Sequence, residues 1–481
     1  MNPSDLWAIS PVLVLVGWAC VLILVDLFIP RDRKSWIALL AAAGLIAAMG
    51  ISISQAGQTL IAFNGMVVAD GFASFLTLLF LSSGLIAIML AYDYLKRLQI
   101  ERGEYYIMLL FSISGMLLMA VSADLIMVFL SLELLSIPLY VLAGFAGERL
   151  SSEESALKYF LMGAFASGFV VYGVALIFGG TGSTSLAEIV AAIGGEAANP
   201  TLLLVGAALV LVGLAFKVAA VPFHMWTPDV YQGAPSSVTA FMSIGAKAAG
   251  FAALLRIFVT ALPSLAVDMT PILWALAAAT MILGNVAAIA QANIKRMLAY
   301  SSIAHAGYIL MALTPYGNPG VSSEAVAAAL LYLVAYALAN FAAWSVVIAL
   351  EQADEKGLMI EDYAGLGKKH PGLAAAMAVA MLSFTGIPPT LGLVGKFFLF
   401  RSAIAGGFIG LAVIGVLTSL ISAYYYLRVV VMMYMRDGDP EVRSEPWLQA
   451  TAIATALATV VLSIVVSPLL NWASQAILAL F

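Results

Sequence analysis

Long apolar runs, separated by short polar or charged stretches, repeat along the whole chain. A membrane-spanning helix needs about 20 apolar residues, and about fourteen runs approach that length. Since 63% of the 481 residues are hydrophobic and only 10% are charged, the composition indicates a polytopic, all-α membrane protein and excludes a soluble domain. The predicted spans are residues 11–29, 36–54, 71–91, 105–122, 125–145, 157–179, 201–222, 234–261, 272–291, 294–313, 325–350, 372–400, 404–434 and 448–469.

Basic residues gather in alternate loops, after spans one, three, five, nine, eleven and thirteen. Cytoplasmic loops are enriched in Lys and Arg, so these loops are expected on the same side of the membrane. The pattern predicts an even number of spans, with both termini on the side opposite the cytoplasm. The residues concerned are Arg31, Arg33, Lys34, Lys96, Arg97, Arg102, Arg149, Lys295, Arg296, Lys356, Lys368, Lys369, Arg436 and Arg443.

Two spans contain prolines that are expected to break their helices. Span seven runs into residues 221–228 (VPFHMWTP), and span twelve contains residues 385–390 (TGIPPT). Non-helical backbone at membrane depth is tolerated only where it is buried in protein or lines a wet cavity. Both spans carry a lysine near the break and run in opposite directions, which is typical of an inverted repeat.

This pattern predicts four segments. They are an N-terminal three-helix segment (1–104), a first five-helix repeat of spans four to eight (105–262), a second, inverted repeat of spans nine to thirteen (263–435) and a C-terminal helix (436–481).

Four ionisable residues lie deep inside predicted spans: Glu133, Lys217, Lys247 and Lys396. A charged side chain at membrane depth costs several kcal/mol, so such residues usually mark an ion or proton path. A carboxylate beside a buried amine changes the proton affinity of both groups, which is a physical basis for a proton relay. The alternatives are a protonated glutamate that bonds a neighbouring helix, and lysines that extend to the membrane surface.

Secondary candidates are two histidines and two lysines. His224 follows the proline of span seven and His305 lies in span ten, where imidazole can pass a proton between its two nitrogens. Either histidine has an alternative role as a hydrogen-bonded packing residue. Lys158 and Lys295 begin helices at the predicted cytoplasmic side, where they either take up protons or simply follow the charge bias of such loops.

The chain offers little for a metal or a redox group. It has one cysteine, Cys20, and three histidines that do not cluster in the sequence, so neither a metal site nor a Cys-ligated cluster is expected. No dinucleotide-binding fingerprint follows a strand. We therefore expect no cofactor in this chain.

One long stretch and four shorter ones resemble the antiporter-like membrane subunits of respiratory complex I, the NADH:quinone oxidoreductase. The long stretch is residues 216–241, FKVAAVPFHMWTPDVYQGAPSSVTAF. The shorter ones are 133–138 (ELLSIP), 295–302 (KRMLAYSS), 362–366 (DYAGL) and 383–389 (SFTGIPP), so the resemblance covers most of the chain. It implies a proton channel in which Glu133 pairs with Lys217, Lys247 is the central relay and Lys396 is the exit-side group.

The resemblance also implies a setting. Electron transfer would take place in partner chains that hold NADH, FMN, iron–sulfur clusters and quinone, while this chain moves protons in a bacterial inner membrane. The implied partners are other membrane-arm subunits, including M-type antiporter-like and small K-type subunits, together with lipids and without nucleic acid. Two alternatives stay open, namely a subunit of a multisubunit cation/proton antiporter and a quinone-binding subunit.

Overall fold

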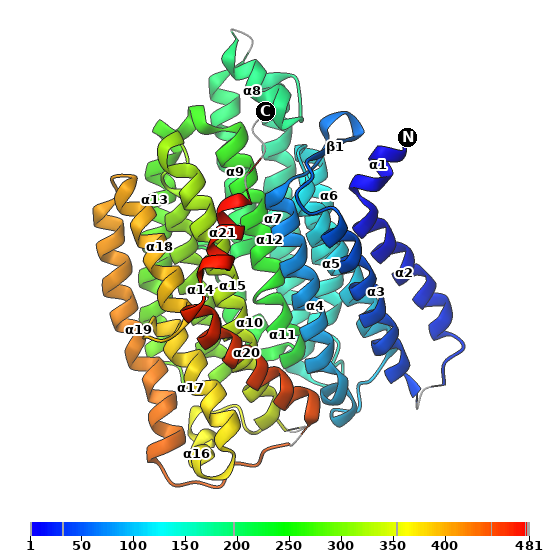
Figure 1. Ribbon diagram of the computed structural model, residues 1–481, viewed down its shortest axis with the longest axis vertical. Coiled ribbons are helices and arrows are strands. Elements are labelled where there is room, and N and C mark those ends of the chain that lie inside the picture. The colour runs from blue at the N-terminus through cyan, green and yellow to red at the C-terminus, as the bar shows by residue number, and fades with distance from the viewer. Residues whose placement is uncertain are drawn as a thin grey trace.

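A bundle of long helices forms the molecule in a computed structural model, which describes residues 2–30, 33–195, 198–352, 355–443, 445–476 and 478 (Figure 1). The first half comprises α1 (Pro3–Ala8), α2 (Ser10–Asp26), α3 (Ser35–Ser54), β1 (Leu60–Ala62), β2 (Val67–Ala69), α4 (Gly71–Arg97), α5 (Gly103–Val121), α6 (Leu125–Ala143), α7 (Leu150–Thr181), α8 (Leu186–Gly194), α9 (Pro200–Val218), α10 (Trp226–Gly233), α11 (Ser236–Met242), α12 (Gly245–Arg256) and η3 (Ile257–Ala261). The second half comprises η4 (Pro263–Leu265), α13 (Ala266–Ile289), α14 (Ile294–Leu313), α15 (Pro319–Leu350), η5 (Ile360–Tyr363), α16 (Leu366–Lys369), α17 (Pro371–Thr385), α18 (Leu391–Ala405), α19 (Ile409–Met435), α20 (Pro446–Ile464) and α21 (Ser467–Gln475).

The predicted all-helical membrane class is confirmed. Within the described residues, 11 helical segments are long and apolar enough to cross a membrane, while α2 and α17 are apolar but shorter. Helices occupy each of the predicted apolar runs. The number of fourteen crossings, the inverted repeats and the segment boundaries stay predictions. The sequence did not predict the antiparallel β1–β2 hairpin or the short helix α8.

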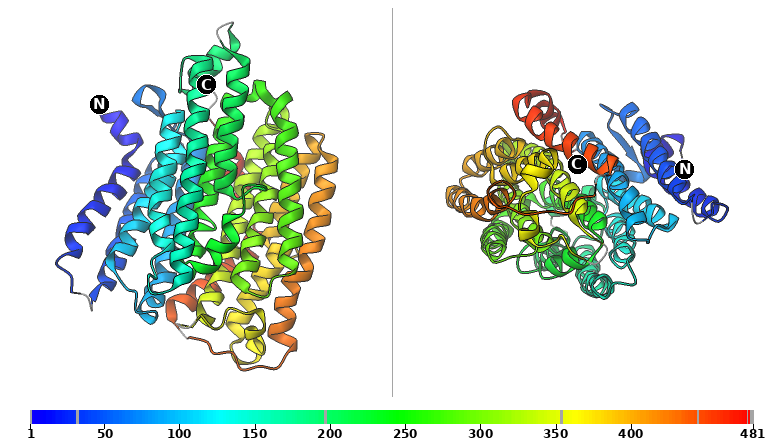
Figure 2. Two further views of the ribbon diagram at one scale, coloured as in Figure 1. Left: turned by 180° about the vertical axis from the view of Figure 1, so that it is seen from behind. Right: turned by 90° about the horizontal axis from the view of Figure 1, so that it is seen from below.

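The two ends of the bundle differ in charge. We call them the α8 end and the α16 end, after the helices that lie there (Figures 1 and 2). Loop bases at the α16 end are paired with acids: Arg97 with Glu445 at 2.5 Å and Lys368 with Asp437 at 2.6 Å. Arg31 lies outside the described residues. The chain crosses back and forth between these ends, so the basic loops are brought together as the charge pattern predicted.

Both predicted helix breaks are present. Helix α9 ends at Val218, where Ala219 takes a left-handed conformation with φ 62°, and α10 begins at Trp226. Helix α17 ends at Thr385, where Gly386 has φ 88°, and α18 begins at Leu391. The prolines between these helices carry no N–H, so they cannot continue the helical hydrogen bonds.

A third break was not predicted. Span eight is divided into α11 and α12 by a turn at Ser243 and Ile244. The amide of Asn340 from α15 donates to the Ser243 hydroxyl, which ties the turn to a neighbouring helix. No proline lies at this break. The local sequence that favours it is Ser-Ile-Gly, since Ser and Gly are common where helices bend.

Close glycine contacts hold α7 against α9. A Cβ atom on Gly173 would lie 2.7 Å from the carbonyl oxygen of Gly206, and one on Gly206 would lie 2.8 Å from that of Gly173. Small residues at such positions let membrane helices approach closely. This packing sets α7, which carries Tyr159, beside the last turn of α9, which carries Lys217.

Candidate functional site

Lys217 lies in the last turn of α9 and is buried, with 3% of its surface exposed. Its Nζ donates to Oγ of Ser136 at 2.7 Å and to the hydroxyl of Tyr159 at 3.2 Å. The Tyr159 ring stacks on Trp226 with centroids 4.6 Å apart, and the Trp226 indole donates to the carbonyl of Phe216 near the end of α9. The negative end of the α9 dipole also favours an ammonium here.

Glu133 does not touch Lys217, so the direct ion pair expected from the sequence is wrong for this structure. The Glu133 carboxylate accepts a hydrogen bond from Ser167 of α7 instead. Ser136 lies one turn further along α6 and takes the place of the carboxylate at the Lys217 ammonium. Any interaction of Glu133 with Lys217 in this arrangement is therefore a long-range electrostatic one.

Lys247 lies in the first turn of α12, directly after the unpredicted break, and is 3% exposed. Its Nζ donates to the carbonyl oxygen of Ser302 at 2.8 Å, and the Tyr231 ring centroid lies 5.9 Å away. The hydroxyl of the same Ser302 accepts from Tyr336 at 2.9 Å. Because the start of a helix is its positive end, this position disfavours a nearby ammonium, in contrast to that of Lys217.

His305 of α14 forms hydrogen bonds with tyrosines of α15 and α19. Its Nδ1 lies 2.6 Å from the Tyr332 hydroxyl, and its Nε2 lies 3.1 Å from the Tyr426 hydroxyl. The ring also lies beside Phe384, with centroids 5.1 Å apart. Both nitrogens face groups that can donate or accept a proton, an arrangement that a relay histidine and a hydrogen-bonded packing histidine share.

Lys396 follows the break between α17 and α18 and is 2% exposed. Its Nζ donates to the carbonyls of Phe384 at 2.7 Å and Thr385 at 3.1 Å and to Oγ of Ser419 at 2.6 Å. The two carbonyls belong to the last turn of α17, where no further helical N–H follows. The Tyr308 ring centroid lies 4.6 Å from the ammonium. The break therefore supplies the acceptors that a buried ammonium needs.

The remaining predicted residues lie apart from this relay. Lys158 is 40% exposed and bonds Asp229 at 2.8 Å and Glu154 at 2.6 Å, in a polar cavity of about 190 Å³ that Arg296 also lines. Partial burial raises the pKa of Asp229, but hydrogen bonds from Lys158 and Arg296 outweigh it and hold the pKa below its usual value. Lys295 is buried and donates to the carbonyl of Ala234 at 2.7 Å.

His224 lies in the break after α9 and is partly exposed. Its Nδ1 is buried without a hydrogen-bond partner. None of the hydrogen bonds to Lys217, Lys247 or Lys396 involves His224. Its role as a secondary relay residue stays a prediction.

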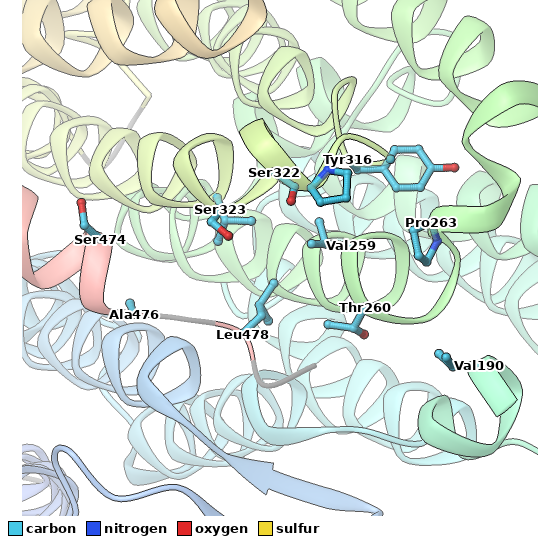
Figure 3. A pocket seen from close by; sticks show the side chains of 13 residues that line it. Val190, Val259, Thr260, Pro263, Tyr316, Ser322, Ser323, Ser474, Ala476 and Leu478 are labelled. Atoms are coloured by element: carbon cyan, nitrogen blue, oxygen red, sulfur yellow. The ribbon is translucent and has the colours of Figure 1, made fainter. Parts of the chain in front are cut away.

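A separate cavity of about 290 Å³ lies at the α8 end (Figure 3). Thr260, Tyr316 and Ser322 supply polar groups, and Val259 and Leu478 supply apolar ones. None of the predicted relay residues lines it. Among the described residues, no group of three or more His, Cys, Asp or Glu side chains is placed to hold a metal ion.

The sequence analysis missed the polar residues that bond the buried lysines and His305. Ser136, Tyr159, Ser302, Tyr332 and Tyr426 each contact a relay residue through a hydrogen bond. Serine and tyrosine are common in membrane helices, so a single one carries no signal. Ser136 alone was accessible to inference, because it lies three residues from Glu133 and hence on the same helix face.

Comparison with known proteins places these features in a family. A family profile described as "NADH:quinone oxidoreductase/Mrp antiporter, TM" matches residues 122–422. A protein of Chloroflexus aggregans named NADH-quinone oxidoreductase subunit N is 48% identical over 450 residues, which cover 93% of this chain and 91% of that protein.

Two solved structures share the fold. A chain of respiratory complex I from Thermus thermophilus is 36% identical, with a TM-score of 0.83, and the match covers 96% of this chain and 99% of that one. A chain of the Mrp complex from Dietzia sp. has a TM-score of 0.86 at 22% identity, with 99% and 97% coverage, which indicates a common fold alone.

Proposed function

The chain belongs to the NADH:quinone oxidoreductase/Mrp antiporter family, and we propose from this premise that it is a proton-translocating membrane subunit of an NADH:quinone oxidoreductase. The observation that carries the proposal is the position of three buried lysines at three helix breaks. Buried ammonium groups are costly, and each of the three has hydrogen-bond acceptors. Lys217 has two side-chain hydroxyls, Lys247 has the Ser302 carbonyl, and Lys396 has the two carbonyls at the α17 break.

The polar contacts suggest the order of the relay. Glu133 influences Lys217 at one side, and Lys217 lies against α12, which carries Lys247. Lys247 leads through Ser302 and Tyr336 to the surroundings of His305. His305 in turn packs on Phe384, whose carbonyl holds Lys396. Protons pass along such a series when changes in field or hydration alter the proton affinity of one group after another.

The proposal assigns no redox chemistry to this chain. NADH, FMN, iron–sulfur clusters and quinone would be bound by partner subunits, and this chain would receive a conformational or electrostatic signal from them. Its partners would include M-type antiporter-like and small K-type membrane subunits. We place the α16 end, where the basic loops lie, at the cytoplasmic face of a bacterial inner membrane and both termini at the periplasmic face.

The test uses Lys247→Ala and Lys247→Arg in the assembled complex, reconstituted in vesicles. We expect both variants to lower proton pumping per NADH oxidised by about tenfold, because Ala has no titratable group and Arg keeps its proton. Lys96→Ala, the loss of an exposed lysine on α4, is the matched control and should pump normally. Normal pumping by Lys247→Ala would exclude the relay, and normal pumping by Lys247→Arg would reduce Lys247 to a fixed charge.

A cation/proton antiporter subunit is the alternative function, favoured only by the shared fold with the Mrp complex chain. The two functions differ in what purifies with the chain and in what ion moves. A complex that contains flavin and iron–sulfur subunits and pumps in sodium-free buffer supports the oxidoreductase. A complex without redox groups that exchanges sodium for protons supports the antiporter.

A further inference from the structure

A fully buried carboxylate, Glu351, lies at the α16 end, outside the proposed relay. It directly follows the last residue of α15, and its side chain has 0% exposure. The Tyr94 hydroxyl lies 3.0 Å from each of its two carboxylate oxygens, and Nη1 of Arg149 lies 3.0 Å from one of them. An ionised carboxylate is rarely buried to this degree without a specific role.

This carboxylate is connected to the start of α11, the segment that leads to Lys247. The Tyr94 hydroxyl donates to Glu351 and accepts from the backbone N–H of Ser236 at 3.0 Å, and Ser236 is the first residue of α11. Two residues earlier, the carbonyl of Ala234 accepts from Lys295 at 2.7 Å. The junction between α10 and α11 is therefore held by Tyr94 on one side and by Lys295 on the other.

The Tyr94 and Lys295 contacts are linked electrostatically through Glu351. Burial raises the pKa of Glu351, but the nearby charge of Lys295 and the charge and hydrogen bond of Arg149 outweigh it and hold the pKa below its usual value. The carboxylate is thus ionised at neutral pH. The charged and titratable groups that contact it or interact with it are Tyr94 of α4, Arg149, Lys295 of α14 and Tyr363. Glu355 in turn interacts with Lys295.

A polar cavity lies beside this region at the α16 end. The cavity, of about 520 Å³, is lined by Leu350 and Gln352, the two neighbours of Glu351 in the chain, and by several acidic residues. On α14, Lys295 and Ser302 are seven residues apart, which corresponds to about 10 Å along the helix. Ser302 holds Lys247. Lys295 is therefore the buried basic group of α14 that lies between Ser302 and the α16 end.

We propose that Glu351 is a positioning residue for proton uptake, which keeps Lys295 charged and, through Tyr94, fixes the start of α11. This inference rests on the proposed function. It identifies Glu351 as the negative charge opposite Lys295 at the α16 end, where protons would enter. When Lys295 is protonated, the carboxylate attracts it and the Ala234 carbonyl has a charged donor. When Lys295 gives up its proton, that attraction is lost and its bond to the Ala234 carbonyl becomes a weaker, neutral one.

The test is Glu351→Gln in the assembled complex, with proton pumping and NADH oxidation measured between pH 6 and 9. Gln keeps an oxygen that can accept from Tyr94 and Arg149 but removes the negative charge. Without the negative charge of Glu351, the Lys295 ammonium loses its proton more readily. We therefore expect the alkaline limit, the pH above which pumping declines, to move down by about one pH unit. Glu351→Asp restores the charge and should move the limit back toward the wild-type value.

Two further variants complete the experiment. Glu104→Gln, on the exposed first turn of α5 at the same end, is the matched control and should leave the pH profile unchanged. If Glu351→Gln does not assemble, Lys295→Arg replaces it: Arg cannot lose its proton, so this variant should lower pumping over the whole pH range, as expected for Lys247→Arg. An unchanged alkaline limit in Glu351→Gln, or normal pumping by Lys295→Arg where that variant replaces it, overturns the inference.

The outcome separates this inference from the proposed function. If Lys247→Ala blocks pumping while Glu351→Gln keeps the wild-type pH profile, the relay stands and the role of Glu351 falls. If Lys247→Ala pumps normally, the relay itself falls, whatever the behaviour of Glu351.

Discussion

The ammonium of Lys217 lies 2.7 Å from Oγ of Ser136, one helical turn from the carboxylate expected to hold it. Glu133 bonds Ser167 on α7 instead, so the acid and the base each bond a different serine and do not contact each other. A direct ion pair between a carboxylate and an ammonium is costly to break in a buried site. Because Glu133 and Lys217 do not contact each other, their electrostatic interaction can change without the loss of such a bond.

Ser136→Ala should impair pumping and destabilise the chain. It removes one of the two hydrogen-bond partners of a buried ammonium, and a hydrogen bond to a charged group contributes about 1.5–3 kcal/mol. Pumping and thermal unfolding of the purified complex measure the two effects. Ser345→Ala is the control, because that buried hydroxyl bonds only the backbone of its own helix, at Phe341. Equal behaviour of the two variants would show that Ser136 has no special role.

Gly250→Ala should displace Lys217. The added Cβ would lie 2.7 Å from Cγ1 of Val218 and 3.4 Å from Cγ of Lys217, and valine is stiff about its χ1 angle. Overpacking of this kind costs about 1–3 kcal/mol and should reduce pumping. Gly168→Ala, where no atom lies within 4 Å of the new Cβ, should leave both stability and pumping unchanged. A normal Gly250→Ala variant would show that α9 and α12 adjust freely.

Lys396→Leu should destabilise the break between α17 and α18. The carbonyls of Phe384 and Thr385 would lose their charged donor, and an unsatisfied buried acceptor costs about 1–3 kcal/mol. Arg401→Leu is the control on the same helix, because its ion pair with Glu324 is largely exposed and contributes about 0–1 kcal/mol. Thermal unfolding in detergent compares them, and an undiminished midpoint for Lys396→Leu would contradict this account.

Arg256→Gln should be among the most destabilising single changes at the α8 end. Two guanidinium nitrogens of Arg256 bond the two carboxylate oxygens of Asp70 at 3.0 and 2.9 Å, and both side chains are nearly fully buried. Breaking a buried pair from one side costs about 3–5 kcal/mol. Arg436→Gln, at an exposed position after α19, should change the unfolding midpoint very little. A similar small effect for Arg256→Gln would be evidence against a structural role.

Asp229 gives a pH-dependent prediction. Its folded pKa lies below the usual 3.8, so its contribution to stability is fully present above about pH 4 and is lost as pH falls through the folded value. The wild type should therefore exceed Asp229→Asn in thermal midpoint at pH 7, and the difference should shrink toward pH 3. A difference that does not vary with pH would mean that the bonds from Lys158 and Arg296 add nothing.

The sequence by itself determined the membrane class, the positions of the apolar helices and the breaks at Pro222 and Pro388. These depend on local chemistry, because an apolar run of sufficient length can be satisfied only as a helix in lipid and proline removes a backbone donor wherever it stands. The buried positions of Lys217, Lys247 and Lys396 followed for the same reason, since each lies far inside such a run.

Only the tertiary structure decided which groups meet. Whether Lys217 bonds Glu133 or Ser136 depends on the rotation of α6 against α9, and a shift of one turn on a helix changes the partner. The break before Lys247 is held by Asn340, nearly a hundred residues away, and Glu351 gains its place from Tyr94 and Arg149 on other elements. Which side chains become partners depends on the angle and register at which two helices pack, and these depend on the surfaces of both helices together.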